Sequence, residues 1–265
     1  MPQMDKNEVE SCLKLLARAS PPPALYRYRK PNGRTLDEIS KQQIYLAPVS
    51  ALNDPFECSA PVCWNPESMR RFLIEVYAPE RGLSPVEAVQ KFGSCSLDWI
   101  QESRRAVFAK GIDQTGFICL SAVPDSIRMW SYYSQAHEGI CVSYDTEKWP
   151  FRASIKVAYQ DPSTPLDVPD ALMRDSSEIA AHVTLRKSAE WEFEREYRIV
   201  ISKIGDQPRL FPFDPLAITE VRLGARIKDD FREKVLEAIS RLPRRPKLIQ
   251  MACDHVRFVL TENVL

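Results

Sequence analysis

Acidic and basic side chains alternate with aromatic and aliphatic ones between Trp191 and Val200 (WEFEREYRIV). We expect a strand here, in which alternate side chains point to opposite faces. One face then carries Trp191, Phe193, Tyr197 and Ile199, and the other carries Glu192, Glu194, Glu196 and Arg198. Carboxylates roughly 6.5–7 Å apart on one face repel each other unless a cation or a ligand lies among them. The segment is therefore either a solvated face of an edge strand or an acidic site for a cationic or polarised group.

A second charged segment, ALYRYR, reads as a strand from residue 24 to residue 29. Alternation places Arg27 and Arg29 on one face with Leu25, and Tyr26 and Tyr28 on the other. Two guanidinium groups on one strand face suit a phosphate or a carboxylate. The alternative is an edge strand whose arginines are solvated.

Two further segments hold more polar and aromatic groups than packing requires. In LNDPFE, Asn53 and Asp54 precede a proline, which predicts an Asx-type turn. In MWSYYSQAHEG, Trp130 and Tyr133 share one side of a predicted helix, and His137 follows four residues later. The two rings either sandwich a planar ligand or form part of the core.

The elements that must position these groups alternate without a regular βα period. We expect helices at residues 8–19, 126–136, 176–189 and 231–242, and helical character from 66 to 110. Strands are expected at 24–29, 43–47, 117–121, 140–144, 153–159, 191–201, 218–223, 248–253 and 256–260. No glycine-rich phosphate loop follows a strand, and the chain has eight glycines in all. This pattern predicts an α+β fold with a curved, mixed, mostly antiparallel sheet and peripheral helices.

The predicted domain organisation is simple. Residues 1–23 form an N-terminal helix that ends at a proline-rich stop, and residues 24–265 form a single α+β domain with a helical insertion at about 66–110.

Composition excludes several classes of protein. Lys plus Arg and Asp plus Glu both number 36, so zero net charge gives no reason to expect broad nucleic-acid binding. No apolar stretch approaches the ~20 residues of a membrane span, and no signal-peptide pattern opens the chain. The seven cysteines are scattered and form no CxxC pair, which predicts reduced thiols, no metal site and a cytoplasmic protein.

Taken in order, the motifs LYRYR, LNDPFE, CLS, MWSYY with HEG, and WEFEREYR resemble the bacterial domain-of-unknown-function family 2971. The resemblance extends from about Leu25 to Leu260. Because the family name carries no established activity, this resemblance implies membership and not function.

A weaker resemblance, to ADP-ribosyltransferases, does imply chemistry. Those enzymes place an Arg on an early strand, a Ser or Tyr in the middle of the chain, and a catalytic Glu late in an E-x-E motif. The matching residues are Arg27 or Arg29 for the first, Ser121 or Tyr45 for the second, and Glu194 and Glu196 for the last. The resemblance also implies an ADP-ribosyltransferase-like fold.

The implied function is NAD-dependent transfer of ADP-ribose, or NAD cleavage, in a bacterial toxin or a phage-defence effector. NAD is then the substrate, and the macromolecular acceptor stays open. Breaking the nicotinamide–ribose bond passes through an oxocarbenium-like cation, which a fixed carboxylate stabilises. The residues expected to bind the nucleotide are Arg27, Arg29, Asn53, Trp130, Tyr133 and His137. The alternatives are a module that senses a nucleotide or phosphorylated ligand without turnover, and a protein-interaction domain.

Overall fold

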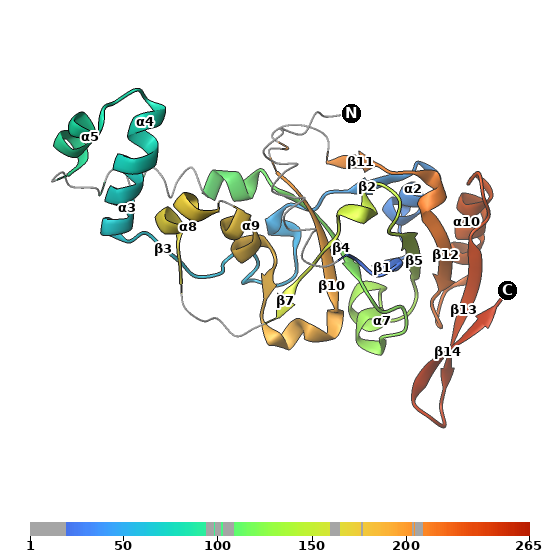
Figure 1. The fold of residues 1–265 in the computed structure, drawn as a ribbon. Coiled ribbons are helices and arrows are strands. Elements are labelled where there is room, and N and C mark those ends of the chain that lie inside the picture. The colour runs from blue at the N-terminus through green and yellow to red at the C-terminus, as the bar shows by residue number, and fades with distance from the viewer. Residues whose placement is uncertain are drawn as a thin grey trace.

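The computed structural model describes residues 20–93, 98, 102, 109–159, 165–175, 177–202, 204 and 209–265. The helix expected at residues 8–19 and part of the helical segment expected at 66–110 lie outside these described residues. Figure 1 shows the described chain as a sheet with helices on both of its faces and a separate group of helices at one end.

The centre of the fold is an open sheet of eight strands among the described residues, in the order β14-β13-β12-β5-β1-β4-β10-β6. Its strands are β1 (Ala24–Arg29), β4 (Gly116–Ser121), β5 (Ile140–Asp145), β6 (Ile155–Lys156), β10 (Glu196–Ile201), β12 (Ile218–Leu223), β13 (Lys247–Asp254) and β14 (Val259–Val264). Neighbouring strands are antiparallel except for β12 and β13. The predicted α+β class with a large, mostly antiparallel sheet is confirmed.

Three two-stranded sheets accompany the large one. They pair β2 (Gln43–Tyr45) with β11 (Leu210–Pro212), β3 (Val62–Cys63) with β8 (Leu166–Asp167), and β7 (Ala158–Tyr159) with β9 (Arg186–Lys187). The strand expected at 153–159 is thus divided between β6 and β7, which belong to different sheets.

One face of the large sheet packs against helices α2 (Gly33–Ser40) and α10 (Asp229–Ser240), and it forms the main apolar core. The sequence predicted no helix at the position of α2. In the structure, the Asn32 side chain accepts a hydrogen bond from the Thr35 amide at 3.1 Å, which caps the helix.

The opposite face packs against α7 (Ile127–Tyr133), whose N-cap is Ser126. After α7, residues 135–137 all have positive φ angles, and the chain reverses at Gly139. A Cβ atom at Gly139 would lie 2.0 Å from the Arg29 carbonyl oxygen, so this close approach of α7's end to β1 requires glycine.

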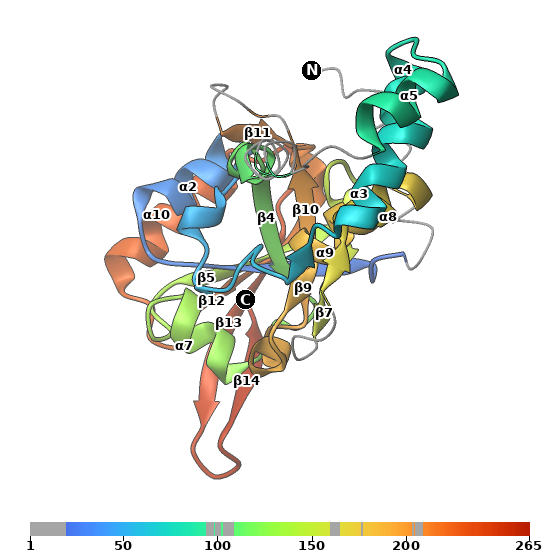
Figure 2. The ribbon, with the colours of Figure 1, turned by 90° about the vertical axis from the view of Figure 1, so that its left-hand side faces the viewer.

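A second apolar cluster lies at the far end of the molecule (Figures 1 and 2). It contains α3 (Pro66–Phe72), the π-helix η2 (Leu73–Tyr77), α4 (Ala78–Glu80), α5 (Pro85–Phe92), α8 (Val168–Arg174) and α9 (Ser177–Thr184). Short 3₁₀-helices complete the fold: η1 (Val49–Ala51), η3 (Phe151–Ala153), η4 (Ala189–Glu194) and η5 (Pro215–Ala217).

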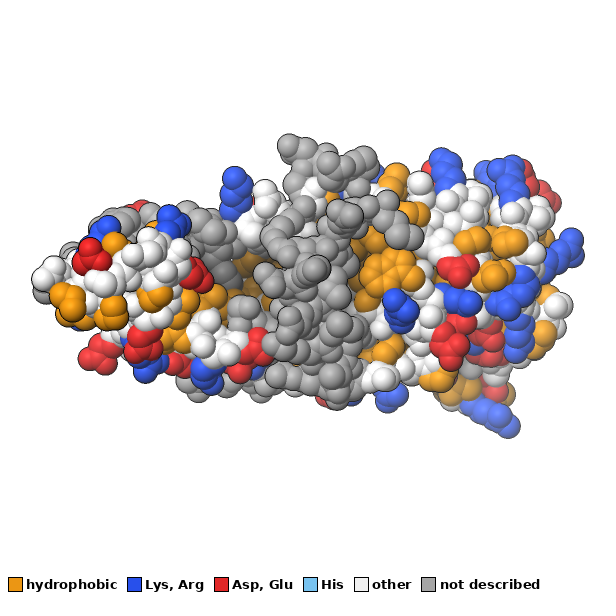
Figure 3. All heavy atoms as spheres, turned by 45° about the horizontal axis from the view of Figure 1, so that its top comes forward, with side chains coloured by type: hydrophobic (Ala, Val, Ile, Leu, Met, Phe, Trp, Pro, Cys, Tyr) orange, Lys and Arg blue, Asp and Glu red, His pale blue; other side chains and the backbone are white. Residues whose placement is uncertain are grey.

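The surface carries charges of both signs (Figure 3), as expected from the zero net charge of the chain. At the right-hand end of the face drawn in Figure 3, Lys and Arg side chains are interspersed with Asp and Glu. None of the helices in the described part of the chain combines the length and the apolar character that a membrane crossing requires.

Candidate functional site

The acidic segment is not one strand. Residues 189–194 form η4, whose N-cap Ser188 accepts a hydrogen bond from the Glu190 amide, and Arg195 takes the left-handed conformation with φ 44°. Strand β10 begins only at Glu196. The expected alternation across Trp191–Val200 is therefore wrong for its first half, because a helical turn and a left-handed residue break the two-residue period. Glu192 is exposed, whereas Glu194 and Glu196 both turn into the interior.

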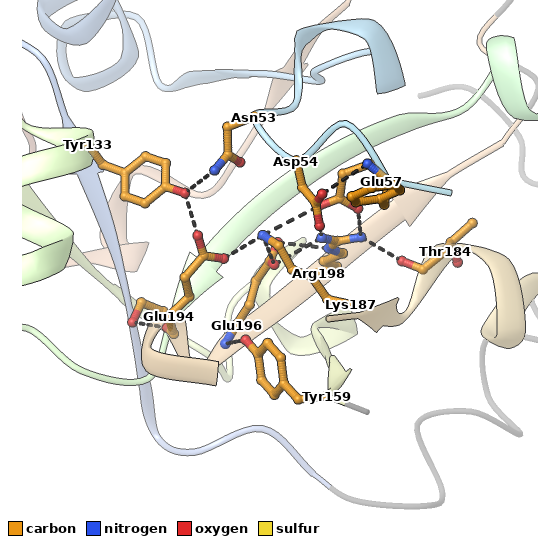
Figure 4. Close-up of polar contacts among 12 residues, drawn as sticks. Asn53, Asp54, Glu57, Tyr133, Tyr159, Thr184, Lys187, Glu194, Glu196 and Arg198 are labelled. Atoms are coloured by element: carbon orange, nitrogen blue, oxygen red, sulfur yellow. Dashed lines mark hydrogen bonds and ion pairs between the residues drawn. The ribbon is translucent and has the colours of Figure 1, made fainter. Parts of the chain in front are cut away.

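Arg198 is the centre of this interior cluster (Figure 4). Its guanidinium is fully buried and donates to both carboxylate oxygens of Glu57, at 2.6 and 2.8 Å, and to both of Glu196, at 2.7 and 2.9 Å. The fifth N–H group donates to the Thr184 carbonyl at 2.9 Å. Since every donor of the guanidinium has an acceptor, Arg198 has no free N–H group for a ligand.

Lys187, on β9, is the second buried cation. Its Nζ atom lies 2.6 Å from a Glu194 oxygen and 3.3 Å from an oxygen of each of Glu196 and Glu57. The outer side of the ammonium faces the Trp191 ring, with Nζ 4.8 Å from the ring centroid. The cluster is thus closed on this side by an aromatic ring.

Glu194 connects the cluster to the protein surface. Its second oxygen accepts a hydrogen bond from the Tyr133 hydroxyl on α7. That hydroxyl accepts in turn from the exposed Asn53 amide at 2.6 Å. A chain of hydrogen bonds therefore runs from Asn53 through Tyr133 and Glu194 to Lys187 (Figure 4).

The cluster holds one more carboxylate than cation, since Glu57, Glu194 and Glu196 face Lys187 and Arg198. Burial alone would raise the pKa of Glu196, but the charge and hydrogen bonds of Arg198, with Lys187, lower it to about 2. The pKa of Glu194 is raised above its ordinary value. Burial is the largest cause, and the negative charge of Glu196 raises the pKa further, whereas Lys187 lowers it without reversing the direction. Glu194 is thus the carboxyl of this pair that takes up a proton more readily.

Backbone contacts fix the two carboxylates. The Ser121 hydroxyl donates to the Glu194 carbonyl at 2.6 Å, and the Glu196 amide donates to the Tyr159 hydroxyl at 2.7 Å. Ser121, expected as a candidate catalytic hydroxyl, lies in the site but holds the backbone there. Cys119 on β4 hydrogen-bonds to Glu196, and burial followed by the Glu196 charge raises the pKa of its thiol well above the ordinary value.

The two arginines of β1 lie elsewhere. Strands β1 and β10 both pair with β4, so they are near each other in one sheet. However, Tyr26 pairs with Ser121, and Ser121 pairs with Glu196, which places Arg27 and Arg29 on the opposite face of the sheet from Glu196.

On that opposite face, Glu38 of α2 holds both arginines. Its oxygens lie 3.8 Å from Arg27 Nε and 3.2 Å from Arg29 Nε, and one of them accepts a hydrogen bond from the Tyr144 hydroxyl at 2.7 Å. Arg27 and Arg29 therefore cannot hold the pyrophosphate of a ligand whose ribose lies beside Glu194.

The remaining expected residues are not brought to the carboxylates either. Tyr45 lies on β2, where the Arg34 guanidinium covers its ring at 5.9 Å. Trp130 has no exposed surface and donates from Nε1 to the Pro124 carbonyl at 2.9 Å, so of the two roles that the sequence left open it takes the one in the core. His137 stacks on Trp130 with ring centroids 6.2 Å apart. Of the expected nucleotide-binding residues, Asn53 and Tyr133 contact the cluster.

Glu57 and Lys187 were absent from the prediction, and Arg198 was expected on the acidic face but was not among the candidate site residues. Glu57 belongs to LNDPFE, where the predicted Asx turn is confirmed because an Asp54 oxygen accepts from the Phe56 amide at 2.9 Å. This turn directs Glu57 inward, to 6 % exposure. The available signal was Arg198 itself, because a guanidinium on a strand that packs in a core must find carboxylates.

Comparison with known proteins supports the family resemblance. Residues 129–199 match the family described as "Protein of unknown function (DUF2971)". The matched segment is shorter than the expected 25–260. It contains Tyr133 and four members of the cluster, Lys187, Glu194, Glu196 and Arg198. No curated protein and no solved structure matches the chain.

Proposed function

We propose that the protein cleaves the bond between nicotinamide and ribose in NAD, releasing ADP-ribose to water or to an acceptor, with Glu194 as the catalytic carboxylate. The observation that carries this proposal is the position of Glu194 at the outer end of a buried cluster with one excess negative charge. Such a cluster favours a cation that develops beside it, because the surrounding protein screens the charge weakly.

The chemistry requires little else from the protein. When the bond between ribose C1′ and the nicotinamide nitrogen breaks, its electron pair neutralises the pyridinium, and the ribose becomes an oxocarbenium-like cation. The ionised Glu194 stabilises this cation, and a water molecule or an acceptor then attacks C1′ and loses a proton. In this proposal the substrate approaches Glu194 from the side of Asn53 and Tyr133, because their hydrogen bonds connect Glu194 to the exposed Asn53 side chain.

The sequence offered both Glu194 and Glu196 as catalytic carboxylates, and the contacts of Glu196 favour Glu194 for this role. Both oxygens of Glu196 accept hydrogen bonds from Arg198, and one also contacts Lys187. Because Glu196 already neutralises these two cations, it stabilises a third cation that develops on the substrate only weakly. Glu196 therefore orients Arg198 and Lys187, and Glu194 faces the substrate.

Release of nicotinamide from NAD tests the proposal. Glu194→Gln keeps the size of the side chain and removes its charge, and we expect the rate to fall by about 100-fold or more. Glu192→Gln is the matched control, because Glu192 lies on the same 3₁₀-helix but is exposed. If wild-type protein releases no nicotinamide with water or with candidate protein, nucleic-acid or small-molecule acceptors, the proposal fails.

One observation favours a second candidate, a module that binds a nucleotide without turnover. Glu194 is only 3 % exposed, and both buried cations already have a full set of carboxylate partners. In such a module, a ligand that binds at Asn53 and Tyr133 changes the hydrogen bonds that lead to the buried cluster, and so changes the cluster without any reaction. Thermal stabilisation by NAD together with unchanged NAD after long incubation would support this candidate over the enzyme.

A further inference from the structure

Aromatic rings form a row that leads from the buried cluster to the surface. Trp191, above Lys187, has its ring centroid 5.9 Å from that of Phe193, and Phe193 lies 6.0 Å from Tyr132. Tyr132 is 63 % exposed, and Trp191 and Phe193 are half-buried. Exposing three neighbouring rings to water is unfavourable, whereas stacking them on a planar ligand ring is favourable.

A cation completes this row. The Arg128 guanidinium lies over the Phe193 ring, 5.2 Å from its centroid, and the side chain is exposed. Among the described residues, no carboxylate lies within ion-pair distance of Arg128. A guanidinium that is held in place by a ring and lacks an anionic partner is suited to a phosphate group.

The row lies directly beside the carboxylate. Tyr132 and Tyr133 are consecutive on α7, and Phe193 and Glu194 are consecutive on η4, which packs against α7. Figures 1 and 2 show these two elements side by side below β10. The inner residues of the two elements form the Tyr133–Glu194 hydrogen bond, and the outer residues form the row.

From these contacts we infer that Tyr132, Trp191, Phe193 and Arg128 form the nucleotide-binding surface of this protein. The rings stack on a planar base, and Arg128 binds the phosphate attached to it. The inference rests on the proposed function for the identity of the nucleotide, a nicotinamide–adenine dinucleotide or its ADP-ribose part. It supplies the cation for the pyrophosphate that Arg27 and Arg29, on the other face of the sheet, cannot provide.

Binding of ADP-ribose, measured by titration calorimetry, tests the surface without any cleavage step. Arg128→Gln should weaken ADP-ribose binding about 10-fold, the scale of a charge-assisted contact, and should leave binding of adenosine, which lacks phosphate, unchanged. Tyr132→Ala should weaken binding of both ligands about 10-fold through lost stacking. The controls are Arg245→Gln and Phe258→Ala, which change an exposed arginine and an exposed aromatic residue outside the row.

The possible outcomes separate this inference from the proposed activity. Weaker binding in the Arg128 and Tyr132 variants, with no nicotinamide release by wild-type protein, supports the surface and refutes the enzyme. Nicotinamide release together with unchanged binding in both variants refutes the surface and leaves the enzyme in place. If wild-type protein binds neither ADP-ribose nor adenosine, the surface is refuted. Melting temperatures equal to that of wild type are expected for both variants, because both side chains are exposed.

Discussion

Glu57 and Arg198 are 141 residues apart in the sequence, and their side chains form a bidentate ion pair that is almost completely buried. Glu57 comes from the LNDPFE turn and Arg198 from β10, so this pair attaches the turn to the sheet. The same turn carries Asn53, the exposed end of the hydrogen-bond chain to Glu194. The pair therefore holds the turn that carries Asn53 against strand β10.

Replacing Arg198 by methionine keeps much of its volume and leaves three buried carboxylates facing only Lys187. We expect Arg198→Met to lower the free energy of unfolding by about 3–5 kcal/mol, as measured by urea denaturation. The double variant Arg198→Met with Glu57→Leu removes one charge of each sign. It should be less destabilised than the sum of the two single variants by at least about 1 kcal/mol. Strict additivity would mean that the two side chains do not act as a pair.

The pH dependence of stability follows from Glu196. Its pKa of about 2 lies below the ordinary value of 4.5, so ionised Glu196 stabilises the folded state at neutral pH. This contribution is complete above pH 4.5 and is lost as the pH falls from there towards 2. The difference in unfolding free energy between wild type and Glu196→Gln should therefore be large at pH 6 and shrink steadily below pH 4.5.

This expectation reverses the one that the sequence suggests, in which Glu196→Gln relieves repulsion among three carboxylates and holds or raises the melting temperature. In the structure, Glu196 contacts two cations, and Glu192 is exposed to solvent outside the cluster. Glu192→Gln is the control and should show no such pH dependence. A melting temperature that rises in Glu196→Gln at pH 7 would show that repulsion outweighs the ion pairs.

Local patterns predicted the strands of the sheet well. The alternation in ALYRYR placed Leu25 and Tyr28 on opposite faces, and the structure has them in different apolar clusters. What local patterns could not supply was the partner of each charge. From the sequence, Arg27 and Arg29 suited a phosphate, but Glu38 pairs with both of them, and it lies on a helix that was not predicted from the sequence.

The acidic segment, residues 191–200, was expected to form one strand, and the structure divides it between η4 and β10. A ten-residue alternation of charged and apolar side chains satisfies a strand, and only Arg195, at φ 44°, separates η4 from β10. The type of a non-glycine residue does not predict that its backbone takes the left-handed conformation. Because it changes the direction of the chain, it brings Glu194 and Glu196 to one ammonium, that of Lys187, which lies on a strand that no periodic pattern marked.

Tyr133→Phe removes the one hydroxyl that links Glu194 to Asn53. A hydrogen bond to a charged group contributes about 1.5–3 kcal/mol, so the unfolding free energy should fall by about that amount. The Tyr133 hydrogen bond lowers the pKa of Glu194, so its loss raises this pKa further. If nicotinamide release requires ionised Glu194, the acidic limb of its pH profile must shift to higher pH in the variant.

Tyr132→Phe is the matched control, because Tyr132 is the adjacent residue on α7 and its hydroxyl has no hydrogen-bond partner among the described residues. It keeps the ring of the proposed binding surface and should leave stability and the pH profile unchanged. A pH profile that stays in place in Tyr133→Phe, despite lower stability, would assign Tyr133 a purely structural role. Glu194 would then not be the group whose ionisation limits the reaction, and the catalytic carboxylate would have to be sought elsewhere.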